Sequence, residues 1–387
     1  MIISILGTAG RDFKTKEPVS FYYDCGVLAK ESRAFCNSLD MLLHNYPKEE
    51  GYFIGTKIAI DFQKELLSFN KKRHHFIEVE DDSLDDVFEK ILELLNQEPN
   101  GAILDITHGF RHQPIMAIFA STLSQFLERK DLKIIYAKEK ERFKSYEYIY
   151  LNEYIEITQI SLLLTGFIRT LNFIPVKNMK LLNNEIFEDF SKSLLSNDMK
   201  GVERDYFLLK EELARLEKNA ELKHLNNLIL KVKSELEPLE MLSFFASYQK
   251  YIVLSKMMVE KNYLVVALAY IFESLREYCS FRFESVCVEI DFKDSYERND
   301  NVMKSIGNYR KENKILKRYP NLYKQNKETF KKVNKLYNKL RKRRNALAHI
   351  NTKSNFEDIK SDLNQMIDKV EKLFNDGILN NLRINEN

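Results

Sequence analysis

The sequence predicts an α/β domain with a mostly parallel sheet, followed by an all-α region. Two patterns along the 387 residues predict this order. Up to about residue 150, short apolar runs alternate with helical patterns, which is typical of βαβ units and a parallel sheet. After about residue 155 the strand patterns stop, and long stretches of helical periodicity such as 205–236 replace them.

Six apolar segments of the N-terminal region are expected to be strands, namely 2–6, 52–55, 76–79, 102–106, 133–137 and 146–151. The segment 83–97 begins with a capping box of Ser83 and Asp86, which predicts a helix. Its apolar stripe consists of Val87, Ile91, Leu94 and Leu95. Another helix is expected around Pro114, with a stripe of Ile115, Ile118, Phe119, Leu123 and Phe126.

The chain is long enough for two domains, and we divide it into three parts. Residues 1–155 are expected to form the α/β domain, 156–240 a helical connector, and 241–387 an all-α C-terminal domain. The chain has only 11 glycines and 7 prolines, so no flexible linker is indicated. We therefore expect the helices of the connector to join the two domains rigidly.

The composition excludes several classes of protein. The longest apolar run, 263–272, is about half as long as a membrane span requires, so we expect no contact with a membrane. Residues 1–10 lack the features of a signal peptide, and a cytoplasmic protein is expected. The four cysteines form no CxxC pair, which argues against a zinc site and a disulfide framework.

Charge is distributed unevenly along the chain. Residues 301–350 contain 16 lysines and arginines but only two acidic residues, Glu312 and Glu328. This window carries a net charge of +14 within a chain whose net charge is +3, so the remainder is acidic. The asymmetry favours contact between the C-terminal region and a polyanion, with a solvated basic helix face as the alternative.

Three predicted strands end in turns of similar chemistry. The turns are Gly7-Thr8-Ala9-Gly10, Gly55-Thr56-Lys57 and Thr107-His108-Gly109. In a parallel sheet all three lie at the carboxyl edge, where ligands bind. Glycine allows a ligand to approach the backbone, threonine donates to oxygen atoms, and the following helix presents free N–H groups. The turns therefore predict a nucleotide or phosphate site, although none is a GxGxxG or Walker A motif.

The third of these turns is the richest in polar groups. Asp105, the last polar residue of its strand, is expected either to accept a bond from a sugar hydroxyl or to brace the amides of the loop. His108 and Arg111 are candidate donors to an anion. The alternative for His108 is an ordinary loop histidine with no role in binding.

Asp105-x-Thr107-His108-Gly109 resembles the DxTHG signature of CRISPR-associated proteins with a CARF domain, a Rossmann-like sensor of cyclic oligoadenylates. The resemblance spans roughly residues 1–155, and the turns after Leu6 and Ile54 also correspond to ligand-contacting loops of that family. It implies a cyclic tetra- or hexa-adenylate as allosteric activator. The implied ligand-binding residues are Gly7, Thr8, Thr56, Lys57, Asp105, Thr107, His108, Gly109, Phe110 and Arg111.

The C-terminal region contains the stretch Arg344-Asn345-Ala346-Leu347-Ala348-His349. It is similar to the R-x4-6-H motif of HEPN ribonucleases, which implies RNA cleavage without a metal or other cofactor. Such cleavage needs a proton shuttle for the attacking ribose 2′-OH and a positive charge on the phosphate. His349 is expected to shuttle the proton and Arg344 to hold the phosphate, while Asn345 is expected to orient either partner or the scissile phosphate.

Helical spacing predicts where Arg344 lies. It falls on an apolar stripe with Val333, Leu336, Leu340 and Leu347. Arg344 and His349 are five residues apart, roughly 140° around a helix, so one helix makes a poor pocket. A two-fold dimer would build a composite site from both protomers. The alternative is that Arg344 pairs with a buried acid such as Glu273 and that His349 caps the helix end.

Together these patterns predict a homodimeric CARF-HEPN endoribonuclease of type III CRISPR defence, activated by cyclic oligoadenylate and specific for single-stranded RNA, with higher oligomers possible. Two alternatives remain. One is a ring nuclease that cleaves its own cyclic ligand, with Thr8 or Thr107 as the first candidate residues. The other is a non-catalytic, nucleotide-sensing regulator whose basic helices bind nucleic acid.

Overall fold

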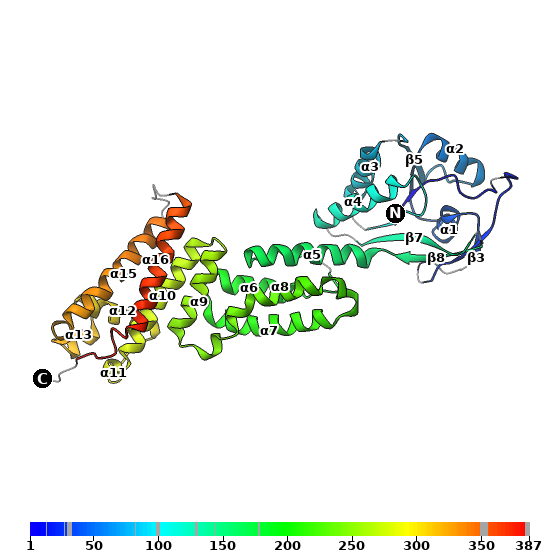
Figure 1. Cartoon of the computed structure of the whole chain (residues 1–387). Helices are drawn as coiled ribbons and strands as arrows, with labels where there is room; N and C mark the ends of the chain where they lie inside the picture. Colours follow the sequence, from blue (N-terminus) through cyan, green and yellow to red (C-terminus); the bar gives the residue numbers. More distant parts are fainter. Residues whose placement is uncertain are drawn as a thin grey trace. The chain divides into compact units, whose positions relative to one another are not determined.

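The computed structural model describes residues 1–12, 14–26, 28, 33–81, 83–97, 101–127, 131–142, 144–176, 179–348 and 355–383. The chain divides into two compact units, which Figure 1 shows in sequence colours. Unit 1 comprises Met1–Leu162 and Val176–Leu182, and unit 2 comprises Leu163–Pro175 and Asn183–Asn387. The boundary falls within helix α5 (Asn152–Thr170).

Unit 1 contains an eight-stranded sheet. The strands are β1 (Ile2–Ile5), β2 (Phe21–Asp24), β3 (Arg33–Phe35), β4 (Gly51–Gly55), β5 (His74–Glu78), β6 (Ala102–Asp105), β7 (Leu132–Glu141) and β8 (Ser145–Tyr150). Their spatial order is β3-β2-β8-β7-β6-β1-β4-β5, and only the pairs β2–β3 and β7–β8 are antiparallel. The mostly parallel sheet confirms the predicted α/β class, and all six predicted strands are present.

Five neighbouring strands, β7-β6-β1-β4-β5, run parallel. The chain moves from β1 outwards through β4 and β5, and then returns to the other side of β1 at β6. This reversal is the topological switch point of a doubly wound sheet, and ligands of such sheets bind outside the carboxyl ends of the strands there. In this protein those ends belong to β1 and β6.

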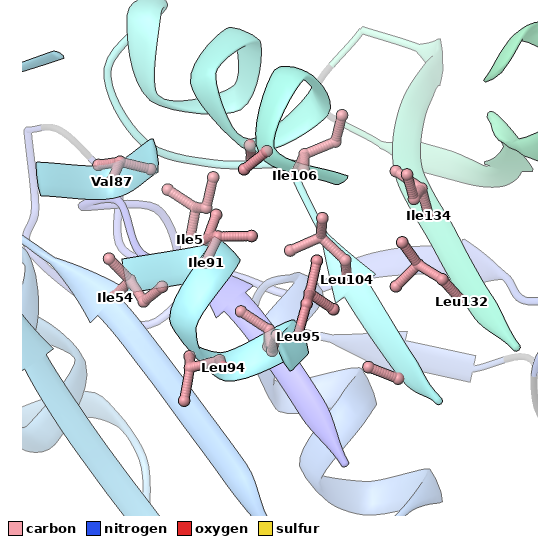
Figure 2. Packing of buried hydrophobic residues seen from close by; sticks show 14 of the residues in the cluster. Ile5, Ile54, Val87, Ile91, Leu94, Leu95, Leu104, Ile106, Leu132 and Ile134 are labelled. Carbon is pink, nitrogen blue, oxygen red and sulfur yellow. The ribbon is translucent and has the colours of Figure 1, made fainter. Parts of the chain in front are cut away.

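Helices cover both faces of the sheet. Helices α3 (Leu84–Gln97) and α4 (His112–Leu127) pack on one face, where Val87 and Ile91 of α3 belong to one buried apolar cluster with Ile5, Leu104 and Ile134 of the sheet. Figure 2 shows this cluster, with Ile91 beside Ile5. All four residues of the predicted α3 stripe are buried. Helices α1 (Ser38–Asn45) and α2 (Lys57–Leu66) contribute to the apolar clusters of the other face. Successive strand residues alternate between the two faces.

The apolar stripe predicted for α4 is not the face that packs on the sheet. Ile115, Phe119 and Leu123 are 49%, 57% and 40% exposed, and Ile118 is half-buried against the core. Among the described side chains of α4, the buried ones are small or polar, namely Gln113, Ala117, Ala120, Ser121, Ser124 and Gln125. Small side chains allow the helix to lie close to the sheet, which leaves the larger apolar residues outside. The side chain of Phe126 is outside the described part of the structure.

Unit 2 is helical. Its helices after α5 are α6 (Asn184–Leu195), α7 (Met199–Lys218), α8 (Asn226–Leu236), α9 (Ser247–Glu260), α10 (Leu264–Arg282), α11 (Glu284–Cys287), α12 (Ser295–Ile306), α13 (Lys314–Arg318), α14 (Leu322–Gln325), α15 (Lys327–Ala348) and α16 (Phe356–Asn375), with short 3-10 helices at Ala220–Leu225, Glu237–Leu239 and Leu242–Phe244. No strand occurs among the described residues after Tyr150.

Helix α10 is the central helix of unit 2, because it packs against α9, α12, α15 and α16. Its buried residues include Leu268, Ile271 and Leu275. Helices α6, α7 and α8, which lie within the expected connector 156–240, belong to the same compact unit as the C-terminal helices. Within the described part of the chain, no helix has the length and apolar character needed to cross a membrane.

Candidate functional site

The sheet topology brings the three predicted turns to one edge. They follow β6, β1 and β4, which are adjacent and parallel. The turns after β1 and β6 are in direct contact, because a Cβ atom added to Gly7 would lie 3.1 Å from the amide nitrogen of Gly109 and 3.1 Å from the Cβ of His108. Only glycine allows so close an approach of two backbones without a shift of one loop.

Asp105 lies behind this edge and not on its surface. Its side chain is completely buried, and its two oxygens accept four hydrogen bonds. Oδ2 accepts from the hydroxyls of Ser4 at 3.0 Å and Ser38 at 2.6 Å, while Oδ1 accepts from the amide of Thr107 at 3.0 Å and from its hydroxyl at 2.5 Å. Of the two expected roles, Asp105 has that of bracing the loop, and it leaves no oxygen for a ligand.

Thr107 also has a structural role. Its hydroxyl donates to Asp105 and accepts a bond of 2.9 Å from the amide of Ala137 on β7. The single hydroxyl proton is therefore used inside the protein. Thr107 joins the end of β6 to its neighbouring strand and holds the loop in place.

The two candidate residues of the turn after β4 differ in their exposure. Thr56 is buried and is the N-cap of α2, where its hydroxyl oxygen accepts from the amide of Ala59 at 3.3 Å. Lys57 is exposed, and its ammonium group lies 3.8 Å from the carboxylate of Asp61. Lys57 can thus reach a ligand, whereas Thr56 shapes the turn that carries it.

Two amide side chains that the sequence did not indicate hold the β1 turn. Gln63 donates to the carbonyl oxygens of Gly7 at 2.7 Å and Ala9 at 3.1 Å, and Asn37 donates to Ala9 at 2.9 Å. Both amides are buried, and they also bond to each other at 3.0 Å. The backbone of the turn is fixed from below, while Thr8 at its tip is exposed.

The loop between β6 and α4 exposes Phe110 and Arg111. Gly109 has a φ of +97°, and an added Cβ would lie 2.5 Å from Ile5 and 2.7 Å from the side-chain oxygen of Gln113. That oxygen accepts from the amide of Phe110 at 3.0 Å. The backbone is therefore locked, and the Phe110 ring is left 50% exposed beside the switch point.

Three side-chain nitrogens at the start of α4 are shielded and have no hydrogen-bond partner among the described residues. They belong to His108, His112 and Gln113. Burial lowers the pKa of His108, and the negative charge of Asp105 only partly opposes this, so the imidazole is neutral at pH 7. The nitrogen of Gln113 is a donor, whereas each imidazole nitrogen donates or accepts according to the tautomer. An unpaired buried polar atom costs about 1–3 kcal/mol. Together with the positive end of the helix dipole, these polar atoms suit a polar or anionic ligand.

The C-terminal motif lies at the end of α15. Val333 and Leu340 of the predicted stripe are buried, and Leu336 and Leu347 are half-buried. Arg344 is half-buried on this side, and its guanidinium carbon lies 4.3 Å from the ring centre of Phe272 on α10. Asn345 is exposed, and His349 lies outside the described residues.

The carboxylate suggested as an alternative partner of Arg344 is engaged elsewhere. Glu273 accepts hydrogen bonds of 3.0 and 3.1 Å from Arg276. No ion pair of Arg344 occurs within the described part of the chain, so its visible contact is the aromatic ring. A half-buried guanidinium that lies on an aromatic ring still has its N–H donors available for an anion.

The neighbouring Arg343 contrasts with Arg344. It donates to Asp362 of α16 at 2.7 and 2.9 Å, and Lys339 donates to the same carboxylate at 2.8 Å. Burial alone would raise the pKa of Asp362, but these two cations lower it below its ordinary value. Arg343 therefore fastens α15 to α16.

The basic window presents a cationic surface. Several of its cations are exposed and make no ion pair with another described residue, namely Lys311, Lys317, Lys324, Lys327, Lys332, Lys335, Arg341 and Lys342. Most of them lie on α15, the helix that ends at the motif. Such a row suits a polyanion. Across the described ranges, no three His, Cys, Asp or Glu side chains gather closely enough to hold a metal ion.

No protein-family model matches the chain, and no curated protein sequence matches it significantly.

Proposed function

We propose that the protein is a CARF-HEPN endoribonuclease of type III CRISPR defence. In this proposal the N-terminal Rossmann-like domain senses a cyclic tetra- or hexa-adenylate, and the C-terminal helices cleave single-stranded RNA in the cytoplasm without a metal. The observation that carries the proposal is Arg344. It is a half-buried cation without a carboxylate partner in the described part of unit 2, at the end of a basic helix.

The ligand site of the sensor would lie at the switch point of the sheet. Thr8, Lys57, Phe110 and Arg111 are the sequence-predicted residues whose side chains are exposed there. An adenine base would stack on Phe110, and a phosphodiester would bind Arg111 and the start of α4. Gly7 and Gly109 would let the ring approach, while Asp105, Thr107 and Thr56 would hold the loops.

The two-fold association has support from α4. This helix of 16 residues contains no Asp, Glu, Lys or Arg in a chain in which these residues make up 30%, and its exposed row is apolar. Its copy would carry the same uncharged row, so the two rows would cover each other without repulsion. Because α4 begins at the ligand loop, such a dimer would bring both loops to one symmetric ligand.

The chemistry would follow from a composite site. The ribose 2′-OH attacks the adjacent phosphorus, and the bond to the 5′-oxygen breaks. Arg344 would stabilise the charge that develops on the phosphate. His349 would move the proton between the two oxygens, and Asn345 would orient the scissile group. Single-stranded RNA has the backbone flexibility that in-line attack requires, in contrast to an A-form duplex.

The test uses purified full-length protein, a single-stranded RNA reporter, EDTA, and either cyclic tetra- or hexa-adenylate. We expect one of the two rings to stimulate cleavage, and Arg344→Ala and His349→Ala to reduce it on the order of 10²-fold or more. Lys369→Ala, at an exposed position of α16 outside the basic window, is the control. Stimulated cleavage that is unchanged in both motif variants would contradict the proposal.

The dimer is tested separately. Phe119→Glu places a charge in the middle of the apolar row, and we expect it to convert the dimer into a monomer in light scattering and to abolish stimulation by the ligand. Lys90→Glu on the exposed side of α3 is the control, and it should leave the dimer intact. Thr122→Glu is less suitable as a control, because Thr122 lies half-buried on α4 beside the apolar row.

A ring-nuclease activity remains a second candidate because Thr8 has an exposed side chain at the proposed ligand. Incubation of the cyclic ligand with wild-type protein and Thr8→Ala, followed by chromatography, tests it. Linear products that depend on Thr8 would support it. Binding of ligand and RNA with no cleavage of either would favour the non-catalytic regulator instead.

A further inference from the structure

A second arginine of unit 2 shares an aromatic ring with Arg344. The ring belongs to Phe272, which is almost completely buried on α10. The guanidinium carbon of Arg344 lies 4.3 Å from its centre and that of Arg276 lies 5.9 Å from it. Two cations from different helices are therefore gathered at one buried ring.

Arg276 is held in a fixed orientation. One of its terminal nitrogens donates to both oxygens of Glu273, and its guanidinium carbon lies 5.3 Å from the ring centre of Tyr296. Its side chain is only 11% exposed. Because a guanidinium has five N–H donors, the bond to Glu273 leaves donors that can bind a second anion. Arginine fixed by a carboxylate on one side is suited to bidentate recognition of phosphate on the other.

The surroundings of this ring carry an excess of positive charge. Tyr337 of α15 stacks on Phe272 with ring centres 5.1 Å apart. Burial raises the pKa of the Tyr337 phenol, although three arginines near it act in the opposite direction, so the phenol is neutral at pH 7. These arginines are Arg276, Arg341 and Arg344. The nearby carboxylates are already paired, Glu273 with Arg276 and Asp300 with Lys304.

We propose that Arg276 is a second phosphate-binding residue of the RNA site, which contacts a phosphodiester next to the one held by Arg344. Phe272 is then a positioning residue that fixes both guanidinium groups. The inference rests on the proposed ribonuclease function, because it deepens the description of the same site. It adds α10 to a site for which the sequence indicated residues of α15 and the segment after it.

The first experiment measures the dissociation constant of a 2′-O-methyl RNA, which cannot be cleaved, by fluorescence anisotropy over a range of salt concentrations. Arg276→Gln should raise the dissociation constant about tenfold at low salt, as expected for the loss of one charge-assisted contact. It should also reduce the salt slope by about 0.7, the value for one phosphate of a single strand. Arg282→Gln is the matched control.

Arg282 is a suitable control because it lies on the same helix and its guanidinium packs over two rings, those of Tyr278 and Phe281. Its two cation–π contacts are with rings other than Phe272, the ring that Arg276 and Arg344 share. Equal dissociation constants and equal salt slopes for Arg276→Gln and Arg282→Gln would overturn the inference.

The second experiment tests the positioning role of Phe272 by the kinetics of RNA cleavage. Phe272→Leu should lower kcat about tenfold or more, because both guanidinium groups lose their common support. Phe283→Leu is the control, since Phe283 is equally buried but stacks on Phe330. Melting temperatures of both variants separate a positioning role from a loss of stability. Equal kcat values at equal stability would contradict the positioning role.

The failures of the two proposals are distinguishable. Wild-type protein that binds the RNA through Arg276 but cleaves none would overturn the ribonuclease and leave the phosphate site. Wild-type protein that cleaves RNA with no effect of Arg276→Gln would overturn the phosphate site alone. A wild-type protein that neither binds nor cleaves RNA would overturn both.

Discussion

Asp105 in unit 1 and Arg344 in unit 2 both carry a charge below the surface, but their surroundings differ. The carboxylate of Asp105 accepts four hydrogen bonds from three side chains and one amide. The guanidinium of Arg344 lies on an aromatic ring and has no ion pair within the described ranges. A buried charge with a complete set of partners stabilises the fold, whereas one without them is available to a ligand.

Each of the two motifs contains residues that support the fold and residues that are left for a ligand. In the DxTHG-like turn, Asp105 and Thr107 build the loop, and the groups left for a ligand are Phe110, Arg111 and the unpaired nitrogens beside them. In the C-terminal motif, Arg343 builds the helix pair and its neighbour Arg344 is left for chemistry. A motif therefore contains both supporting and acting residues, and hydrogen-bond partners distinguish them.

The largest expected effect is on the rate of RNA cleavage when one of two adjacent arginines is replaced. Arg344→Leu should reduce the rate of cleavage on the order of 10²-fold or more. It should change the free energy of unfolding by less than about 1 kcal/mol, because only a cation–π contact is lost. Arg343→Leu should retain cleavage and lose about 1–2 kcal/mol, because Asp362 keeps only Lys339. Cleavage assays and urea unfolding measure these two quantities. Retained cleavage in Arg344→Leu together with lost cleavage in Arg343→Leu would contradict these roles.

Asp105→Asn should cause the largest loss of stability. Asparagine has one acceptor oxygen where the native residue has two, so buried donors remain unpaired at a cost of about 2–3 kcal/mol. Urea unfolding gives the magnitude, and hydrogen exchange of β6 amides assigns it to unit 1. Asp61→Asn, an exposed acid of the same unit, should stay within about 0.5 kcal/mol. Similar losses in both variants would show that Asp105 does not brace the loop.

A smaller effect is expected at the contact between α15 and α16. The folded pKa of Asp362 lies below its ordinary 3.8, so its contribution is present above that pH and is lost as the pH falls through the folded value. Asp362→Asn should therefore be about 1 kcal/mol less stable at pH 7 and equal to the wild type at strongly acidic pH. Unfolding free energies measured from pH 7 to pH 2 test this. A difference that does not depend on pH would contradict it.

The smallest effect concerns His108. Its folded pKa lies below 6.5, so the unfolded chain binds the proton more readily, and stability falls as the pH decreases below 6.5. The slope from this single group is at most about 1.4 kcal/mol per pH unit. His108→Gln should flatten the profile between pH 6.5 and 5, whereas His224→Gln, at an exposed position of unit 2, should not. Identical profiles would show that His108 is not held in its neutral form.

Much of unit 1 follows from local patterns. All six predicted strands are present, because apolar runs bounded by turns are a strong local signal. Strands β2 and β3 were not predicted, since they are only four and three residues long and partly exposed. The exposed stripe of α4 was misinterpreted because its spacing predicts a helix face without showing which face the sheet accepts.

Local sequence patterns are sufficient to predict the α/β class, the order of the strands along the chain, the turns at three strand ends and the apolar stripe of α15. Which charges have partners depends on the tertiary structure. Ser38 donates a hydrogen bond to Asp105, 67 residues away, and Phe272 of α10 contacts Arg344 of α15. No local sequence pattern predicts either contact. Hydrophobic periodicity is a property of neighbouring residues, whereas the partner of a buried charge depends on which distant elements pack together.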